Sequence, residues 1–480
     1  MSELYQKMLT FTVSAFVSCM VCQSVSVQAS DIDIYANATG GKTTLFLMFD
    51  TSGSMGYGLN YGSNASSVSS LVQDYNVCQG ISSVGSETKN YSINGGTQQS
   101  YSVNYCDVSR NTYNGLNSTY RTRIANECSS TGTNTYRCYD RLSRLKIAIV
   151  SLLSSSDILD TVRIGLGQFS SPTGTSETSQ DGVSGRVIYP VVPLTATNRQ
   201  SLISAVTALQ AYNGTPSAAA YGEAGAYMLG ANTNGLTYSG YSYSVSNSKN
   251  GNNGYLPPLS SSDLTNTCNG QGIYFLTDGF ANNSDPTKPY TTNIMQRSVG
   301  TLTGTGLTGG DSYAGWTQIG QFAKILRNNK NIKTAVVGFG SEFPNGANYV
   351  RDFPVTIGSR TVTRRFYDCS QLSSGDLQNT CNWGAKENAS LPNVGGYGNG
   401  GFYSAQSTQD VIDSVKYFVD EVTPTFDAVT TGSPTLPQDA LNPLRVLPYG
   451  YYASFIPTPQ DSTQLWLGNL NKYRVLEGQL

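Results

Sequence analysis

Apolar residues along this chain fall into two alternating patterns, short continuous runs and runs at helical spacing. Leu45–Phe49 is a run of five apolar residues, which is typical of a strand buried on both faces of a parallel sheet. Ile273–Thr277 and Ile332–Phe339 give further strands of this kind. Helices are predicted where apolar residues recur every three or four positions, over 141–153, 199–209, 215–229, 313–327 and 408–422. This alternation predicts an α/β fold with a doubly wound, mostly parallel sheet.

Three weaker strands complete the expected sheet. Val162–Leu166 alternates like a half-buried strand, and Gly401–Ser404 is the expected last strand. Val187–Val192 contains Pro190, which cannot donate a ladder hydrogen bond, and this segment is therefore expected at a sheet edge.

Long polar stretches rich in Gly, Ser, Asn and Tyr interrupt this scaffold. A structureless loop of such length is unusual inside a compact domain. The cysteines favour folded excursions pinned by disulfides. We expect one domain over 30–422, followed by a β-rich segment over 423–480 that would lead to a further C-terminal domain. The expected insertions cover about 57–140, 230–270, 280–311 and 341–398.

The composition excludes several classes of function. Charged residues make up 12% of the 480-residue chain, about half of the usual share, and the net charge is −2. No long cluster of Lys and Arg is present, and nucleic-acid binding is not expected. The chain contains no histidine, which removes Ser-His-Asp and Cys-His nucleophiles and every His-ligated metal.

The first 29 residues have the pattern of a secretory signal. Lys7 precedes an apolar stretch over Met8–Val21, and Val27-Gln28-Ala29 provides a small-residue cleavage site. A lipoprotein signal ending at Cys19 fits less well. No later apolar run reaches the ~20 residues of a spanning helix. The mature chain is expected to be exported and to have no membrane span.

Seven cysteines remain after the signal, and export makes disulfides the natural interpretation. Cys128–Cys138 and Cys369–Cys381 each close a short loop and are the preferred pairs, and Cys78–Cys106 is plausible. Cys268 is then left over. It would pair with another subunit or with a further C-terminal region, unless the assumed pairing is wrong.

Oxygen-bearing side chains follow two of the predicted strands. Asp50, Ser52 and Ser54 alternate directly after the first strand, Thr215 precedes a helical run, and Asp278 ends the strand at 273–277. Several oxygens facing one point suit a hard divalent cation such as Mg²⁺. Each residue also has a structural interpretation, because Asp and Ser form turns and Thr215-Pro216 could cap a helix.

In this arrangement the sequence resembles the von Willebrand factor A-type domain with its metal-ion-dependent adhesion site. The resemblance implies that Asp50, Ser52, Ser54, Thr215 and Asp278 bind Mg²⁺, or alternatively Mn²⁺ or Ca²⁺. It also implies the strand order 3-2-1-4-5-6, which would place Asp50 beside Asp278. A carboxylate of a partner would complete the metal shell, and ligation would be coupled to movement of the helix at 408–422.

The segment Trp466-Leu467-Gly468-Asn469-Leu470-Asn471-Lys472-Tyr473 resembles the PilC/PilY family of type IV pilus-tip adhesins. That resemblance implies a location from the periplasm and outer membrane to the cell surface and pilus tip, with minor pilins as partners. The family's calcium-binding propeller would begin after Leu480, so the chain is either an N-terminal piece or naturally short. Propeller functions are not carried over.

The sequence therefore predicts a non-enzymatic pilus-associated adhesin or assembly factor that binds a carboxylate of a host or surface protein through a metal. The alternative is a structural scaffold at the pilus tip whose metal only stabilises the fold. A metal-dependent hydrolase is a weaker third interpretation, because no general base or second metal site is evident. The tyrosine-rich insertions are either adhesive surfaces or solubilising loops.

Overall fold

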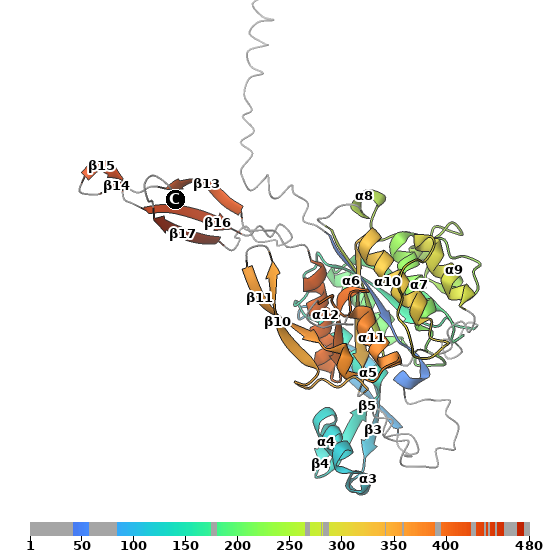
Figure 1. Ribbon diagram of the computed structural model, residues 1–480. Coiled ribbons are helices and arrows are strands. Elements are labelled where there is room, and N and C mark those ends of the chain that lie inside the picture. The colour runs from blue at the N-terminus through green and yellow to red at the C-terminus, as the bar shows by residue number, and fades with distance from the viewer. Residues whose placement is uncertain are drawn as a thin grey trace, which may run out of the picture. The chain divides into compact units, whose positions relative to one another are not determined.

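The computed structural model describes most of the chain between residues 42 and 474 (Figure 1). It divides into two compact units, one over Gly41–Pro424 and one that includes Thr425–Leu480. The predicted signal at 1–29 lies outside the described residues. In the larger unit the described residues are 42–56, 84–173, 180–264, 269–279, 281, 288–340, 342–357, 360–388 and 395–423. In the smaller unit they are the strands within 429–474.

A six-stranded sheet organises the larger unit. Its strands in spatial order are β12 (Asn399–Ala405), β9 (Ile332–Phe339), β8 (Gly270–Thr277), β1 (Thr43–Phe49), β6 (Arg163–Phe169) and β7 (Gly185–Pro193). All neighbours are parallel except β7, which runs antiparallel at the edge, as Pro190 predicted. When the six strands are numbered by their order in the chain and read from β7 to β12, they follow the expected order 3-2-1-4-5-6. β1 and β8 are adjacent at the point where this order reverses.

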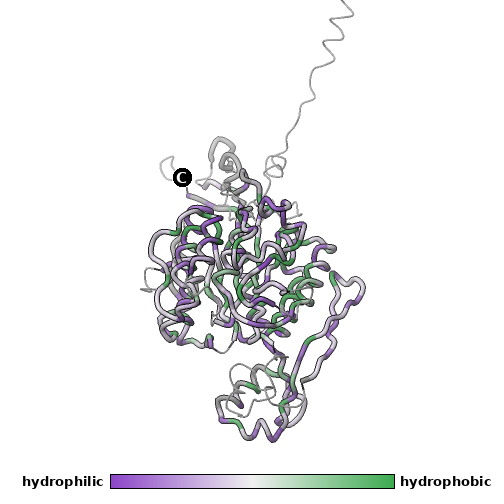
Figure 2. The backbone as a smooth tube through the Cα atoms, turned by 90° about the vertical axis from the view of Figure 1, so that its right-hand side faces the viewer, coloured by the Kyte–Doolittle hydropathy of each residue, from purple (hydrophilic) through white to green (hydrophobic). Residues whose placement is uncertain are grey.

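Helices cover both faces of this sheet, so the predicted doubly wound α/β architecture is confirmed. Leu45, Leu47 and Phe49 of β1 pack into one apolar cluster with α5 (Arg141–Ser154), α6 (Ala196–Thr207) and α12 (Thr408–Val422). Phe46 and Met48 point into the opposite cluster, which contains residues of four further helices. These are α7 (Ser217–Leu229), α9 (Pro289–Val299), α10 (Trp316–Lys330) and α11 (Asp376–Gly384). Figure 2 shows apolar segments running through the interior of this unit.

Some predicted helix boundaries differ from the structure. The helix expected at 199–209 begins at Ala196, because Thr195 caps it by accepting a bond from the Asn198 N–H. The helix expected at 313–327 begins at Trp316. The stretch over 280–311 was expected to be only a polar insertion, yet it contains α9. Only three of its residues are buried, Thr291, Ile294 and Met295, and so few core positions give little periodic signal.

The described part of the first insertion is folded. An antiparallel sheet in the order β2-β3-β5-β4 carries two helices. A small separate core includes Cys106, Val108 and Ile124, and Cys128 is bonded to Cys138. The elements are β2 (Val84–Tyr91), β3 (Gln99–Val108), α3 (Arg110–Gly115), α4 (Ser118–Glu127), β4 (Ser129–Gly132) and β5 (Thr135–Tyr139). We call this part, residues 84–139, the inserted sheet.

The later insertions also contain regular structure. In 230–270 there are two single-turn 3₁₀ helices, η4 (Tyr241–Tyr243) and η5 (Ser246–Ser248), and a short helix α8 (Ser261–Leu264). In 341–398 the hairpin β10 (Val350–Ile357) and β11 (Arg360–Tyr367) precedes the turn η6 (Cys369–Gln371) and α11.

Two of the predicted disulfides are confirmed, Cys128–Cys138 and Cys369–Cys381. Cys106 is disulfide-bonded as well. Its proposed partner Cys78, like Cys268, lies outside the described residues.

The described residues of the smaller unit form β-strands. Three antiparallel strands lie in the order β13 (Val429–Thr435), β16 (Tyr449–Phe455) and β17 (Gly468–Arg474), and β14 (Gln438–Asp439) pairs with β15 (Asn442–Val446). Trp466 and Leu467, of the segment that resembles the PilC/PilY family, lie outside the described residues, whereas Gly468 to Tyr473 belong to β17. Across both units, no described helix combines the length and the apolar character needed to cross a membrane.

Candidate metal centre

The candidate site begins where β1 ends. The Asp50 N–H still pairs with the Leu276 carbonyl of β8 at 2.9 Å, so the carboxylate of Asp50 stands between two neighbouring strand ends. One of its oxygens accepts the Ser52 N–H at 2.8 Å. The other accepts the Thr277 hydroxyl at 3.0 Å and faces the Asp278 N–H at 3.4 Å. Asp50 is therefore held in place by both strands and is fully buried.

Four of the five predicted ligands form one hydrogen-bonded cluster. The hydroxyls of Ser52 and Ser54 share a bond of 2.9 Å, and Ser54 donates to Oδ2 of Asp278. Asp50 and Asp278, although far apart in the sequence, are joined at the carboxyl ends of β1 and β8. Ser52 and Asp278 are buried, whereas Ser54, in the short 3₁₀ turn η1 (Gly53–Met55), is partly exposed. The cluster thus approaches solvent at Ser54.

Thr215 lies on a segment that is bonded to the same loop. The Gly53 N–H donates to the Asn213 carbonyl and the Tyr212 N–H donates to the Thr51 carbonyl, both at 2.8 Å. Thr215 follows two residues after Asn213 and is buried. The N-cap of α7 is Pro216, which makes no side-chain cap bond, so the simple interpretation of Thr215 as the N-cap is wrong by one position.

The two carboxylates impose an electrostatic cost on each other. Burial, together with the nearby carboxylate of Asp278, raises the pKa of Asp50 to about 7, against the opposing bonds from Ser52 and Thr277. Two buried acidic groups at such close range require a positive charge to remain ionised together. This is a place where a cation would stabilise the fold.

One positive charge at the site comes from a residue that the sequence analysis treated only as the start of a helix. Arg141, the first residue of α5, donates from Nη1 to Oδ2 of Asp278 at 2.7 Å. Both side chains are buried, with 8% and 2% of their surfaces exposed. A cation is unfavourable at a helix N-terminus because of the helix dipole. An arginine at that position was thus a usable signal that a carboxylate partner lay nearby.

The donor set fits a small, hard divalent ion. Oδ2 of Asp278 accepts hydrogen bonds from Ser54 and Arg141, whereas Oδ1 is buried and has no hydrogen-bond partner among the described residues. A buried carboxylate oxygen without a donor is costly and is suited to a metal. Among the described residues no group of three or more His, Cys, Asp or Glu is arranged around a common point. Any ion here would depend on two carboxylates, hydroxyls and water, which is the coordination that Mg²⁺ tolerates well.

Sequence comparisons give no relative for this chain: no protein-family model matches it, and no curated protein does. Some solved structures are similar in part. The PilB minor pilin from Streptococcus sanguinis aligns with a TM-score of 0.32 and 12% identity, over 79% of this chain and 61% of PilB. The pilus adhesin SpaC from Lactobacillus rhamnosus GG aligns with a TM-score of 0.30 and 12% identity, over 65% of this chain and 33% of SpaC. The chain therefore spans less than two thirds of either neighbour, and scores this low do not assign it to a fold family.

Proposed function

We propose that this chain is a non-enzymatic, pilus-associated adhesin or assembly factor whose larger unit binds a divalent metal and, through it, a partner's carboxylate. The observation that carries the proposal is the convergence of Asp50, Ser52, Ser54 and Asp278 into one cluster at the ends of β1 and β8. Thr215, on a segment bonded to the same loop, is the proposed fifth ligand.

Each residue of the site has a defined task. Asp50 and Asp278 provide the negative charge, and the hydroxyls of Ser52, Ser54 and Thr215 provide neutral oxygens. When bound, the metal would supply a Lewis-acidic position for a carboxylate of the partner. Because Ser54 is the partly exposed member of the cluster, we place the partner on its side.

The strand order 3-2-1-4-5-6 and the position of the cluster support assignment of this unit to the von Willebrand factor A type. The pilus connection is supported by the sequence resemblance around Trp466–Tyr473. Export to the cell surface, through a signal at 1–29, belongs to the same proposal.

Calorimetric titration of Mg²⁺, Mn²⁺ and Ca²⁺ into the purified mature chain tests the metal site. We expect about one ion bound per chain, and none in Asp50→Ala. Asp420→Asn, which removes an exposed carboxylate on α12, is the matched control and should bind like the wild type. If no ion binds to the wild-type chain, the proposal is wrong.

A second experiment separates adhesion from a purely structural role. Asp50→Ala is introduced into cells that display the protein, and both piliation and adherence are measured. Normal pili with lost adherence support the adhesin. Loss of pili together with adherence favours a scaffold at the pilus tip whose metal stabilises the fold.

A further inference from the structure

Arg141 lies at the junction between the inserted sheet and helix α5. It follows β5 of the inserted sheet by two residues and is the first residue of α5. Figure 1 shows β3 and β5 close to this end of α5. The Arg141 side chain forms an ion pair with Asp278, which follows the last residue of β8, and only 8% of the Arg141 side chain is exposed.

The guanidinium of Arg141 and a bound metal would serve the same carboxylate. Oδ2 of Asp278 accepts a hydrogen bond from Arg141 at 2.7 Å, and Oδ1 of the same group is buried with no donor in the described part of the chain. A divalent ion on this carboxylate would lie close to a fixed positive charge in a poorly solvated site, where repulsion between like charges is strong. Without a metal, the same arginine offsets the charge of two buried acidic groups.

The first turn of α5 is itself fixed, so Arg141 cannot be displaced without consequences. Asp140 caps the helix by accepting the Ser143 N–H at 2.6 Å. The hydroxyl of Ser143 in turn accepts the Asn104 N–H of β3 at 2.8 Å. A shift of Arg141 would therefore be transmitted to the capping turn and from there to the inserted sheet.

We propose that Arg141 is a tethered cation that competes with the metal for Asp278, lowers the affinity of the site, and couples metal binding to the inserted sheet. This inference rests on the proposed metal site. It adds that the metal-free state is an ion-paired state stabilised by the chain itself, and that metal binding must weaken the Arg141–Asp278 pair.

The test compares Mn²⁺ and Mg²⁺ titrations of the wild type, Arg141→Gln and Arg297→Gln. The last variant removes an exposed positive charge on α9 and serves as the matched control. We expect Arg141→Gln to bind the metal on the order of tenfold more tightly, because a like charge has been removed, and Arg297→Gln to bind like the wild type. Equal affinity in Arg141→Gln and the wild type, or weaker binding in Arg141→Gln, overturns the inference while the metal site stands. No binding by any of the three overturns the metal site itself.

Thermal unfolding gives a second readout. In metal-free buffer, Arg141→Gln should have a lower Tm than the wild type, because two buried carboxylates lose their counter-charge. Added Mn²⁺ should raise its Tm by more than it raises that of the wild type. A variant that folds only with metal present supports the inference, and an identical Tm gain in both proteins contradicts it.

Hydrogen exchange tests the coupling. On adding Mn²⁺ to the wild type, amides in the first turn of α5 and in β3 near Asn104 should exchange at a changed rate. The same amides in Arg141→Gln should respond less, because the ion pair is already absent. An equal response in both proteins overturns the coupling.

Discussion

The hydroxyl of Thr277 donates to a carboxylate oxygen of Asp50 at 3.0 Å, across the boundary between β8 and β1. Thr277 is not among the proposed metal ligands, but it fixes the orientation of one of them. It is buried and ends the strand that leads into Asp278. The position of Asp50 is thus set by a residue from a strand that is distant in sequence and adjacent in space.

Removing that hydroxyl should weaken metal binding while preserving the fold. Thr277→Val keeps the shape of the side chain but frees an oxygen of Asp50, and loss of such an orienting bond costs about 10–100-fold in metal affinity. Thr334→Val is the control, because it removes a buried hydroxyl that bonds Tyr221 instead, at 2.6 Å. Calorimetric titration with Mn²⁺ should separate the two, and an unchanged affinity in Thr277→Val would contradict the orienting role.

The buried carboxylate of Glu223 on α7 should make stability depend on pH. Three hydroxyls, of Thr233, Ser239 and Tyr255, donate to its Oε1, whereas its Oε2 is buried and none of the described residues bonds to it. Burial raises its pKa from 4.5 to about 7, with these bonds acting in opposition. The folded state therefore holds a proton that the unfolded state has released, and stability is lost as the pH rises from about 4.5 through about 7.

Glu223→Gln removes this titration. It should be more stable than the wild type at pH 8 by up to about 3 kcal/mol, and the difference should vanish near pH 4. Urea unfolding at several pH values measures this. Glu387→Gln, at an exposed ion pair with Arg327, should show no such pH-dependent gain. A constant difference between Glu223→Gln and the wild type at all pH values would refute the prediction.

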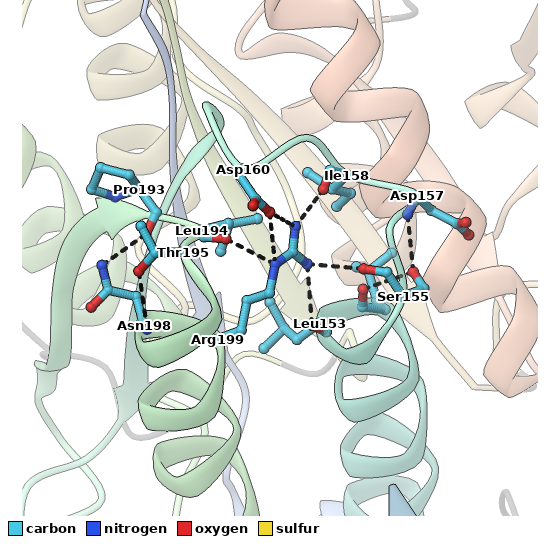
Figure 3. A network of polar contacts seen from close by, with 11 residues as sticks. Leu153, Ser155, Asp157, Ile158, Asp160, Pro193, Leu194, Thr195, Asn198 and Arg199 are labelled. Carbon is cyan, nitrogen blue, oxygen red and sulfur yellow. Dashed lines mark hydrogen bonds and ion pairs between the residues drawn. The ribbon is translucent and has the colours of Figure 1, made fainter. Parts of the chain in front are cut away.

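Arg199 on α6 forms hydrogen bonds with the end of α5, with the segment that follows it, and with Leu194 after β7. Figure 3 shows its guanidinium surrounded by the carbonyls of Leu153, Ser155, Ile158 and Leu194, together with the carboxylate of Asp160. The Arg199 side chain is only 2% exposed, whereas that of Asp160 is 66% exposed. Most of its partners are therefore backbone carbonyls, among them those at the end of α5.

Arg199→Met should lower the free energy of unfolding by about 3 kcal/mol or more, because several buried carbonyls lose their donor at once. Asp160→Asn should cost less than about 1 kcal/mol, since it alters only the exposed ion pair. Denaturant unfolding of both variants measures the contrast. Equal losses would show that the ion pair, and not the carbonyl bonding, carries the effect.

The Cys128–Cys138 disulfide should stabilise the inserted sheet independently of the larger core. This sheet has a small apolar cluster of its own, and the bond joins residues 10 apart in sequence. In Cys128→Ser/Cys138→Ser, loss of about 3 kcal/mol should unfold this part first. We expect a separate low-temperature transition in calorimetry, whereas Cys369→Ser/Cys381→Ser should affect the transition of the core around the six-stranded sheet, which contains both of these cysteines. A single transition shared by the whole unit would contradict this independence.

The sequence by itself determined the strands that carry the candidate site. β1 and β8 are runs of apolar residues that end on Asp50 and Asp278, and burial on both faces of a parallel sheet produces that pattern locally. The strand Ile332–Phe339 was predicted with the correct bounds for the same reason. The closing helix Thr408–Val422 was predicted with the correct bounds because its apolar residues recur at helical spacing. Two disulfides followed from short spacings together with the expectation that the chain is exported.

Only the tertiary structure decided how charges are paired. Arg141 and Asp278 are 137 positions apart, and no periodicity links them, because each belongs to a different local element. The partners of Glu223 come from loops whose paths the sequence does not specify, and those of Arg199 come from such loops and from the end of α5. Helix α9 was missed because it buries too few residues to give a periodic pattern. Hydrophobic periodicity records which face of an element is buried, whereas pairing across the sheet depends on where the elements meet.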